Sequence, residues 1–193
     1  MTHPEGDRPE GGGEPELEPG TVLAAGTVIY GGMAAVALIW LWARERSGTL
    51  AEQAVGEHGP LASSGVGLLV GLIGAWILGL LTKRYASLQE VASAAQQVFA
   101  RAGNGVGLAF VMISAIAEEL FFRLAVQDVF GLIGSVACYV LLNSSVGGAR
   151  WILFTFAHAL VLGLIVHLGF GLLGSTTAHA ILNYLSLRRI QSS

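Results

Sequence analysis

The chain has 193 residues, of which 53% are hydrophobic and only 12% are charged, whereas an average soluble domain has about 25% charged residues. Six of the 13 acids lie within the first 20 positions, which leaves 7 acids and 9 bases for the other 173 residues. So little charge excludes an ordinary soluble protein and a nucleic-acid partner, while the single cysteine, Cys138, excludes an internal disulfide and a cysteine-based metal cluster.

The N-terminal segment differs from the rest of the chain. Residues 1–20 are dominated by Gly, Pro and Glu and lack apolar periodicity, which predicts a disordered acidic tail. Residues 21–190 are predicted to form one membrane-embedded domain, because their apolar runs are too long for buried helices of a soluble core. The expected fold is all-α, a polytopic membrane helix bundle with about six transmembrane helices plus one amphipathic interfacial helix.

Six apolar stretches predict the transmembrane helices, at 21–43, 61–82 and roughly 106–127, 130–146, 150–168 and 171–187. The second stretch contains Gly67 and Gly71, a GxxxG pattern that permits close contact between helices. Residues 86–101 repeat apolar side chains at helical spacing, with polar side chains on the other faces. This segment is expected to lie at the membrane surface as an amphipathic helix, or to pack on the bundle as a polar-faced cover.

The distribution of bases predicts the orientation in the membrane. With six spans, two bases fall on one side of the membrane, Arg44 and Arg46, and seven fall on the other: Arg8, Lys83, Arg84, Arg101, Arg150, Arg188 and Arg189. Since loops rich in Lys and Arg stay in the cytoplasm, both termini are expected to be cytoplasmic. The compact size and the Gly-rich apolar core indicate a bacterial inner membrane.

The third apolar stretch contains three charged residues near its middle, Glu118, Glu119 and Arg123. Charges at this depth cost several kcal/mol, so they must face protein or water. Glu119 and Arg123 are four positions apart with the acid first, which favours a structural ion pair. Glu118 points about 100° away and needs another partner. It is a candidate general base or acid, and the alternative is a protonated, hydrogen-bonded core acid.

Two further apolar stretches carry polar residues one helical turn apart. Phe154 and His158 lie in the fifth stretch, and His179 and Asn183 lie in the sixth. A single buried His is usually a core residue, but polar groups on three apolar helices are expected to satisfy one another across a bundle. Their depths predict one cavity that opens toward the expected cytoplasmic side. His167, nine residues after His158, is interpreted as an interfacial or packing residue.

Together these residues resemble three motifs of the CAAX protease and bacteriocin-processing (CPBP, also called Abi) family of glutamate-type intramembrane endopeptidases. The resemblance covers residues 105–187 and rests on Glu118-Glu119-x-x-x-Arg123, Phe154-x-x-x-His158 and His179-x-x-x-Asn183. The family commonly has more spans and a longer connection between the two histidines. The resemblance implies that Glu119, Arg123 and Phe154 support the site.

The resemblance also implies the catalytic roles. Glu118 would activate water with the help of His158, and His179 and Asn183 would stabilise the developing oxyanion. The implied activity is hydrolysis of a peptide bond near the membrane-anchored end of a protein or peptide substrate, with the lipid bilayer as the other partner. Candidate substrates are prenylated CAAX tails, bacteriocin leader peptides and hydrophobic sorting tails of surface proteins.

Several alternatives remain open at this point. No cofactor is expected, although zinc bound by Glu118, His158 and His179 is an alternative, because two His and a Glu can hold it. A non-catalytic bacteriocin-immunity or scaffold protein would retain the same polar core only for packing. Ser175, one turn before His179, suggests a serine protease, but no GxSG-type elbow surrounds it. A haem protein with His158 and His179 as axial ligands leaves the carboxylates unexplained.

Overall fold

A computed structural model describes residues 19–102, 104–143 and 148–191 of the chain. Side chains are described for these residues except 19, 22, 95–102, 104, 190 and 191. The predicted acidic tail therefore lies outside the described residues, apart from its last two positions, where the first helix already begins.

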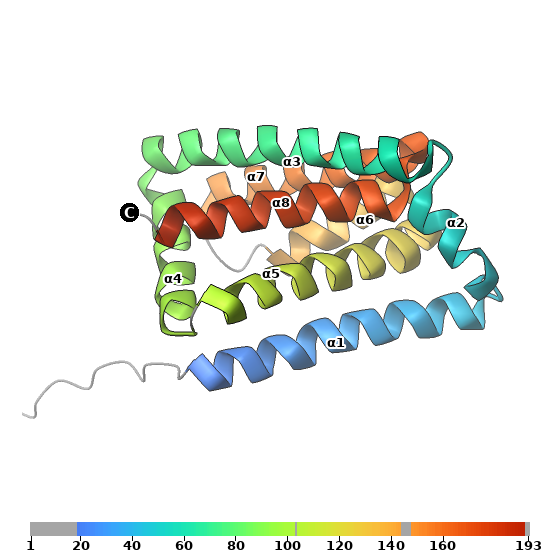
Figure 1. Ribbon diagram of the computed structural model, residues 1–193, viewed down its shortest axis with the longest axis horizontal. Coiled ribbons are helices and arrows are strands. Elements are labelled where there is room, and N and C mark those ends of the chain that lie inside the picture. The colour runs from blue at the N-terminus through green and yellow to red at the C-terminus, as the bar shows by residue number, and fades with distance from the viewer. Residues whose placement is uncertain (1–18, 103, 144–147, 192–193) are drawn as a thin grey trace, which may run out of the picture.

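All regular elements in the described part of the chain are helices, as the composition predicted (Figure 1). They are α1 (Pro19–Ala43), the short η1 (Ser47–Thr49), α2 (Leu50–Val55), α3 (Gly59–Arg84), α4 (Ala86–Ala102), α5 (Asn104–Glu119), α6 (Gln127–Asn143), α7 (Gly148–Ile165) and α8 (Gly171–Gln191), with π-helical turns η2 (Leu120–Val126) and η3 (Val166–Phe170). Residues 86–101, predicted to be an amphipathic helix, correspond to α4.

The long helices run side by side along the bundle, and α4 crosses one of its ends (Figure 1). Four continuous helical stretches among the described residues are long and apolar enough to cross a membrane: Leu23–Ala43, Gly59–Arg84, Gly105–Asn143 and Gly148–Arg189. The last two contain 39 and 42 residues, about twice the length that a bilayer requires. Each of these two stretches therefore folds back on itself. The described part of the bundle thus contains the six long helical segments that the sequence predicted.

Glycines make these two reversals possible. Gly131 has φ 66° and ψ −175°, and Gly171 has φ 61° and ψ −174°. This backbone region is essentially accessible only to glycine. As a result α5 and η2 lead in one direction along the bundle and α6 returns behind them, and α7 and α8 form a second antiparallel pair (Figure 1).

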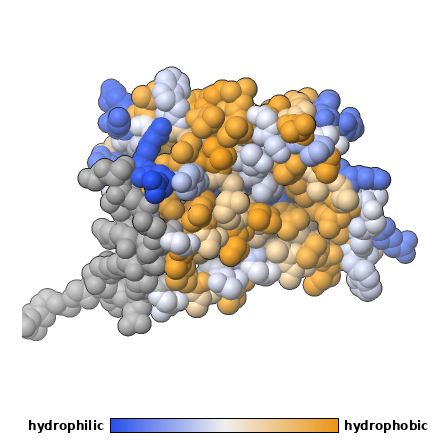
Figure 2. Space-filling view, in the orientation of Figure 1, coloured by the Kyte–Doolittle hydropathy of each residue, from blue (hydrophilic) through white to orange (hydrophobic). Residues whose placement is uncertain are grey.

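The outer surface of the bundle has the polarity expected of a membrane protein. Figure 2 shows an apolar band across the helices, with hydrophilic residues gathered at the two ends. Large apolar side chains on the surface of the bundle are exposed, including Leu141, Leu153 and Trp76, at 74%, 68% and 60%. Such a surface is stable when lipid covers it, because exposed apolar area of this extent is unfavourable in water.

Helices α3 and α8 pack with direct backbone contact. A methyl group added at Gly67 would lie 2.4 Å from the carbonyl oxygen of Gly174, and one added at Gly71 would lie 2.7 Å from that of Ala178. Both distances are too short for a real side chain. The close helix contact predicted from the GxxxG pattern is thus confirmed, and glycines of α3 from Gly67 to Gly79 meet α8 from Gly174 to Arg189.

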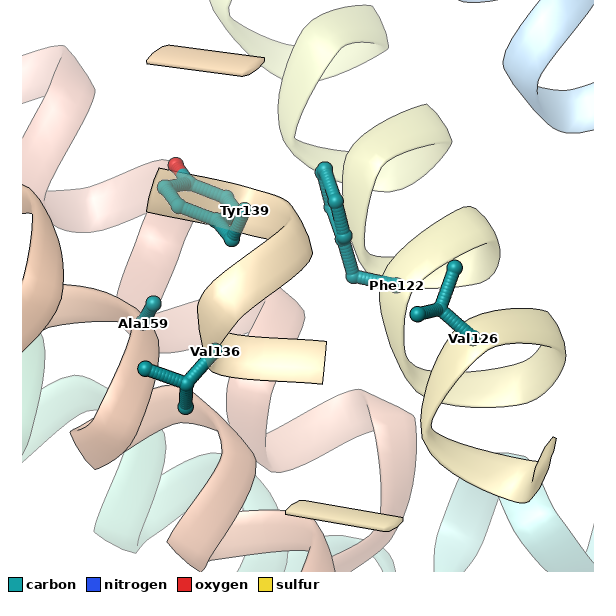
Figure 3. Close-up of a cluster of buried hydrophobic side chains, with 5 residues drawn as sticks. All are labelled: Phe122, Val126, Val136, Tyr139 and Ala159. Atoms are coloured by element: carbon teal, nitrogen blue, oxygen red, sulfur yellow. The ribbon is translucent and has the colours of Figure 1, made fainter. Parts of the chain in front are cut away.

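A buried apolar cluster fixes α6 and α7 against η2. Figure 3 shows Phe122 and Val126 facing Val136 and Tyr139, with Ala159 beside them. Phe122 and Ala159 are almost fully buried, at 1% and 0% exposure. This packing holds the polar end of Tyr139 near the charged residues of the third apolar stretch.

Candidate active site

The carboxylates stand at the end of α5, where the helix changes geometry. Glu118 and Glu119 are the last residues of α5, and the π-helical turn η2 begins immediately after them at Leu120. Arg123 lies within this turn and is 3% exposed. π-helical turns within α-helices occur frequently at functional sites, and this one directs the Arg123 side chain back toward Glu119.

Glu119 and Arg123 form the ion pair that their spacing predicted. Arg123 Nε donates to Glu119 Oε2 at 3.1 Å, and both side chains are completely buried. Arg123 also donates through Nη1 to Ser135 Oγ at 3.0 Å and through Nη2 to the carbonyl oxygen of Ala159 at 3.3 Å. The guanidinium therefore connects the α5–η2 segment to α6 and α7 and satisfies its own donors, as a buried charge requires.

His179 of α8 lies between the two carboxylates. Its Nδ1 is 3.0 Å from Glu119 Oε1, a hydrogen bond, and its Nε2 is 3.9 Å from Glu118 Oε2. The second distance is too long for a hydrogen bond. An ionised carboxylate only accepts hydrogen bonds. Glu119 therefore accepts one from Arg123 and a second from His179 Nδ1. This bond fixes the ring orientation and aims Nε2 at Glu118.

Glu118 is the carboxylate that remains available for chemistry. Its Oε2 atom is buried and has no hydrogen-bond partner. The phenol groups of Tyr30 and Tyr139 lie close to this carboxylate. A buried acceptor without a partner is unusual in a native structure and calls for an explanation such as a ligand or water.

His158 of α7 completes the cluster through ring contacts. Its ring centroid lies 4.9 Å from that of His179, with the two planes at 79°. Phe154, one turn earlier, stacks on His158 at 5.9 Å with an interplanar angle of 7°, and Tyr139 contacts it edge-on at 6.1 Å. These aromatic neighbours hold the imidazole beside His179 without charge pairing.

A cavity of about 360 Å³ brings the predicted site residues together. Its lining includes Glu118, Phe154, His158, His179 and Asn183. Glu119 and Arg123 are not among the lining residues and stand behind His179. The cavity thus brings together residues that were predicted on three separate apolar stretches. The supporting pair, Glu119 and Arg123, lies outside its lining.

The cavity extends toward the end of the bundle where α4 lies. Leu88, Val91 and Ala92 of α4 line it, together with Asn143 and Trp151 near the same end. The bases with described side chains at this end lie where α3 and α8 end and where α7 begins: Lys83, Arg84, Arg150, Arg188 and Arg189. Residues of α4 with apolar side chains therefore cover the cavity, while Gln89, Glu90 and Ser93 are exposed.

A second cavity of about 490 Å³ lies between α3, α7 and α8. It is lined mainly by apolar residues and shares His158, Phe154, Leu88 and Leu182 with the first cavity. Leu153 and Ile77 on its border are exposed, at 68% and 43%. This second cavity, called the lateral groove below, connects the lipid-facing surface to His158.

Three residues of the site were missed from the sequence. Tyr139 and Ser135 of α6 reach Glu118 and Arg123 respectively, and Tyr30 of α1 lines the cavity. Ser135 and Tyr139 are four positions apart in an apolar stretch, which is the same signal that identified the histidines. Tyr30 carries no such signal, because one Tyr in an apolar helix is common.

The other predicted residues are placed as follows. His167 is exposed in the π-helical turn η3, which follows α7. Ser175 is buried and donates to the carbonyl oxygen of Leu172, so its hydroxyl is used within α8. Among the described residues, no group of three or more His, Cys, Asp and Glu side chains is arranged to hold a metal ion.

In comparisons with the models of known protein families, with curated proteins and with solved structures, nothing matches this chain. Function is therefore inferred from the geometry of the site and from the motifs in the sequence.

Proposed function

We propose that the protein is an intramembrane endopeptidase in which Glu118 activates the attacking water. One observation carries the proposal: a buried Glu118 oxygen without a partner faces a cavity that also contains two histidines and an asparagine. A general base needs a free acceptor within reach of a water molecule. The resemblance of the three motifs to those of the CPBP family supports the same reaction.

In the proposed peptide hydrolysis, residues of the cavity accept and return every proton that is transferred. Glu118 accepts a proton from water as the water oxygen attacks the scissile carbonyl carbon. Asn183 donates to the oxyanion through its amide. The C–N bond then breaks, the proton held by Glu118 passes to the leaving amine, and the products are a carboxylic acid and an amine.

The role of His179 as a donor to the oxyanion depends on the protonation state of its ring. With Nδ1–H directed at Glu119, the Nε2 atom donates to an oxyanion only when the ring carries a second proton. The neighbouring Glu119 and Glu118 carboxylates, against the single Arg123 guanidinium, supply the negative charge that such an imidazolium needs. His158, stacked on Phe154 next to His179, completes the polar side of the cavity.

The lateral groove supports a membrane-anchored substrate. It gives an apolar path from the lipid-facing surface to His158, so a hydrophobic segment can reach the site without crossing water. The five bases at the α4 end support the orientation in which this end faces the cytoplasm of a bacterium with the protein in its inner membrane. Labelling with an impermeant maleimide tests the orientation, using Ser93→Cys and Ser47→Cys in a Cys138→Ala background. Labelling of Ser47→Cys alone from outside intact cells is expected.

The activity is tested with the purified full chain in nanodiscs. A library of hydrophobic peptides that end in charged residues is incubated in H₂¹⁸O, and the products are identified by mass spectrometry. The expected result is cleavage with one ¹⁸O atom in each new carboxyl group, abolished in Glu118→Gln and unchanged in Glu52→Gln, an exposed acid at the opposite end. Cleavage that survives in Glu118→Gln contradicts the proposal.

A non-catalytic scaffold is the second candidate. The observation that favours it is the hydrogen bonding of Arg123 to Glu119, Ser135 and Ala159, which ties helices together without any chemistry. A scaffold requires this network and does not require Glu118. Retention of the cellular function in a Glu118→Gln strain, together with absence of cleavage by the parent protein, would favour this candidate.

A further inference from the structure

Thr155 of α7 has a buried hydroxyl group that has no hydrogen-bond partner among the described residues. Its side chain is 3% exposed, it lines the cavity of the candidate site, and its Oγ1 atom has no hydrogen-bond partner. It lies three residues before His158, on the side of the cavity that extends toward α4.

Hydroxyl groups in helices usually donate to a carbonyl oxygen three or four residues earlier. Six described hydroxyls do so, on Thr27, Thr49, Thr82, Ser114, Ser175 and Ser186. Three of these, Thr82, Ser114 and Ser186, line the same cavity as Thr155. The polarity and the depth of the cavity therefore do not explain why the Thr155 hydroxyl lacks a hydrogen bond to a helix carbonyl.

Only two of the four buried unpartnered polar atoms in the described part of the chain lie in this cavity. They are Glu118 Oε2 and Thr155 Oγ1, whereas Trp40 Nε1 and Ser87 Oγ belong to residues that do not line it. The two atoms are chemically complementary. An ionised carboxylate only accepts hydrogen bonds, whereas a hydroxyl group also donates.

A peptide substrate has groups that match this pair. In a mainly apolar cavity, each of its backbone carbonyls requires a donor. Thr155 is three residues from His158, or about 4.5 Å along the helix axis at 1.5 Å per residue. An extended peptide advances about 3.3 Å per residue. Consider a peptide that runs along α7 with its scissile bond beside the histidines. Its backbone carbonyl one or two residues closer to the α4 end then lies next to the Thr155 hydroxyl.

We infer that Thr155 is a substrate-binding residue whose hydroxyl donates a hydrogen bond to a backbone carbonyl of the peptide substrate next to the scissile bond. The inference rests on the proposed peptidase function. It assigns to α7 a binding role in addition to carrying His158, and it gives the buried Thr155 hydroxyl an acceptor.

The test uses two variants of Thr155 and one matched control. Thr155→Val removes the hydroxyl and keeps the branched shape, and Thr155→Ser keeps the hydroxyl. Thr27→Val removes a hydroxyl that lines neither cavity and already bonds to the carbonyl oxygen of Leu23. Each protein is assayed in nanodiscs with the peptide cleaved best in the library experiment, and kcat and KM are measured separately.

Thr155→Val is expected to lower kcat/KM at least tenfold, while Thr155→Ser stays within about threefold of the parent and Thr27→Val is unchanged. The midpoint of thermal unfolding without peptide is expected to stay the same or rise in Thr155→Val, because no partner is left unsatisfied. A purely structural role predicts the opposite, a lower unfolding midpoint that accompanies the loss of activity.

Equal kcat/KM in Thr155→Val and the parent overturns the inference, and so does a lower unfolding midpoint in Thr155→Val. Loss of cleavage in Glu118→Gln together with normal cleavage in Thr155→Val rejects only the role of Thr155. Cleavage that persists in Glu118→Gln, or absence of any cleaved peptide with the parent protein, rejects the proposed function and the inference together.

Discussion

The Nδ1 atom of His179 lies 3.0 Å from Glu119, sixty positions earlier in the chain, and this bond separates the roles of two consecutive glutamates. Glu119 uses both carboxylate oxygens, one for His179 and one for Arg123. Glu118, one position earlier, keeps a buried oxygen without a partner. The first carboxylate of the pair is therefore available for chemistry, and the second orients the histidine.

Replacing Glu119 with Gln is expected to lower the rate of cleavage at least about 10²-fold, because an amide no longer fixes His179 with one defined proton position. Glu118 and the cavity remain in place in this variant. The check is a double-mutant cycle on kcat with Glu119→Gln and His179→Gln, since residues that act as one unit give non-additive losses. Additive losses in the double variant would contradict the coupling of Glu119 to His179.

Arg123→Met is expected to lower the free energy of unfolding by about 3–5 kcal/mol, because it leaves the buried Glu119 charge without its partner. The control is Arg46→Met. Arg46 pairs with Asp128 at the end of the bundle away from α4, where its side chain is 39% exposed, so its removal is expected to change stability by less than about 1 kcal/mol. Denaturant titration in detergent measures both, and similar losses would argue against a structural role special to Arg123.

The sequence predicted the seven long helices well because each of them carries a long apolar run or a clear polar stripe. The six-residue helix α2 (Leu50–Val55) carries neither and was not predicted. It also predicted the Glu119–Arg123 pair, since both residues lie on one helix face four positions apart. Spacing along one helix says nothing about partners on other helices. The bond between His179 and Glu119, and the freedom of Glu118, depend on how α8 approaches α5 and were not predictable from the motifs.

The reversals of the chain were also only partly predictable. The chain contains 27 glycines, so Gly131 and Gly171 could not be distinguished from glycines that serve helix contacts. Gly131 differs from Gly67 in its backbone conformation, with φ at 66°, and in having nothing within 4 Å of an added methyl group. Such differences arise from tertiary structure and cannot be read from the composition.

Gly67→Ala is expected to destabilise the bundle by roughly 1–3 kcal/mol, because the new methyl group would meet the backbone of α8 and force the helices apart. Gly65→Ala on the same helix is the matched control. Gly65 is exposed and has open space around an added methyl group, so alanine there is expected to be neutral or to stabilise by up to about 1 kcal/mol. Thermal unfolding in one detergent compares the two, and equal midpoints would contradict the contact between α3 and α8.

The lateral groove gives the last prediction, which concerns how a substrate reaches the site. Ala157 of α7 lines the groove and is exposed, so Ala157→Phe fills it without touching the carboxylates. For a peptide embedded in the nanodisc, this variant is expected to lower kcat/KM about tenfold, equivalent to about 1.4 kcal/mol. For a short water-soluble peptide with the same scissile bond, which reaches the cavity from the α4 end, the expected change is small.

Ala137→Phe provides the control for this experiment, because Ala137 is an exposed alanine of α6 that lines neither cavity. It adds the same aromatic ring to the lipid-facing surface and is expected to leave both peptides unaffected. Equal losses for the embedded and the soluble peptide in Ala157→Phe would mean that the added ring disturbs His158 directly. Unchanged cleavage of the embedded peptide would mean that substrates enter past α4, and the apolar side chains of Leu88 and Val91 would then be the surface that must move.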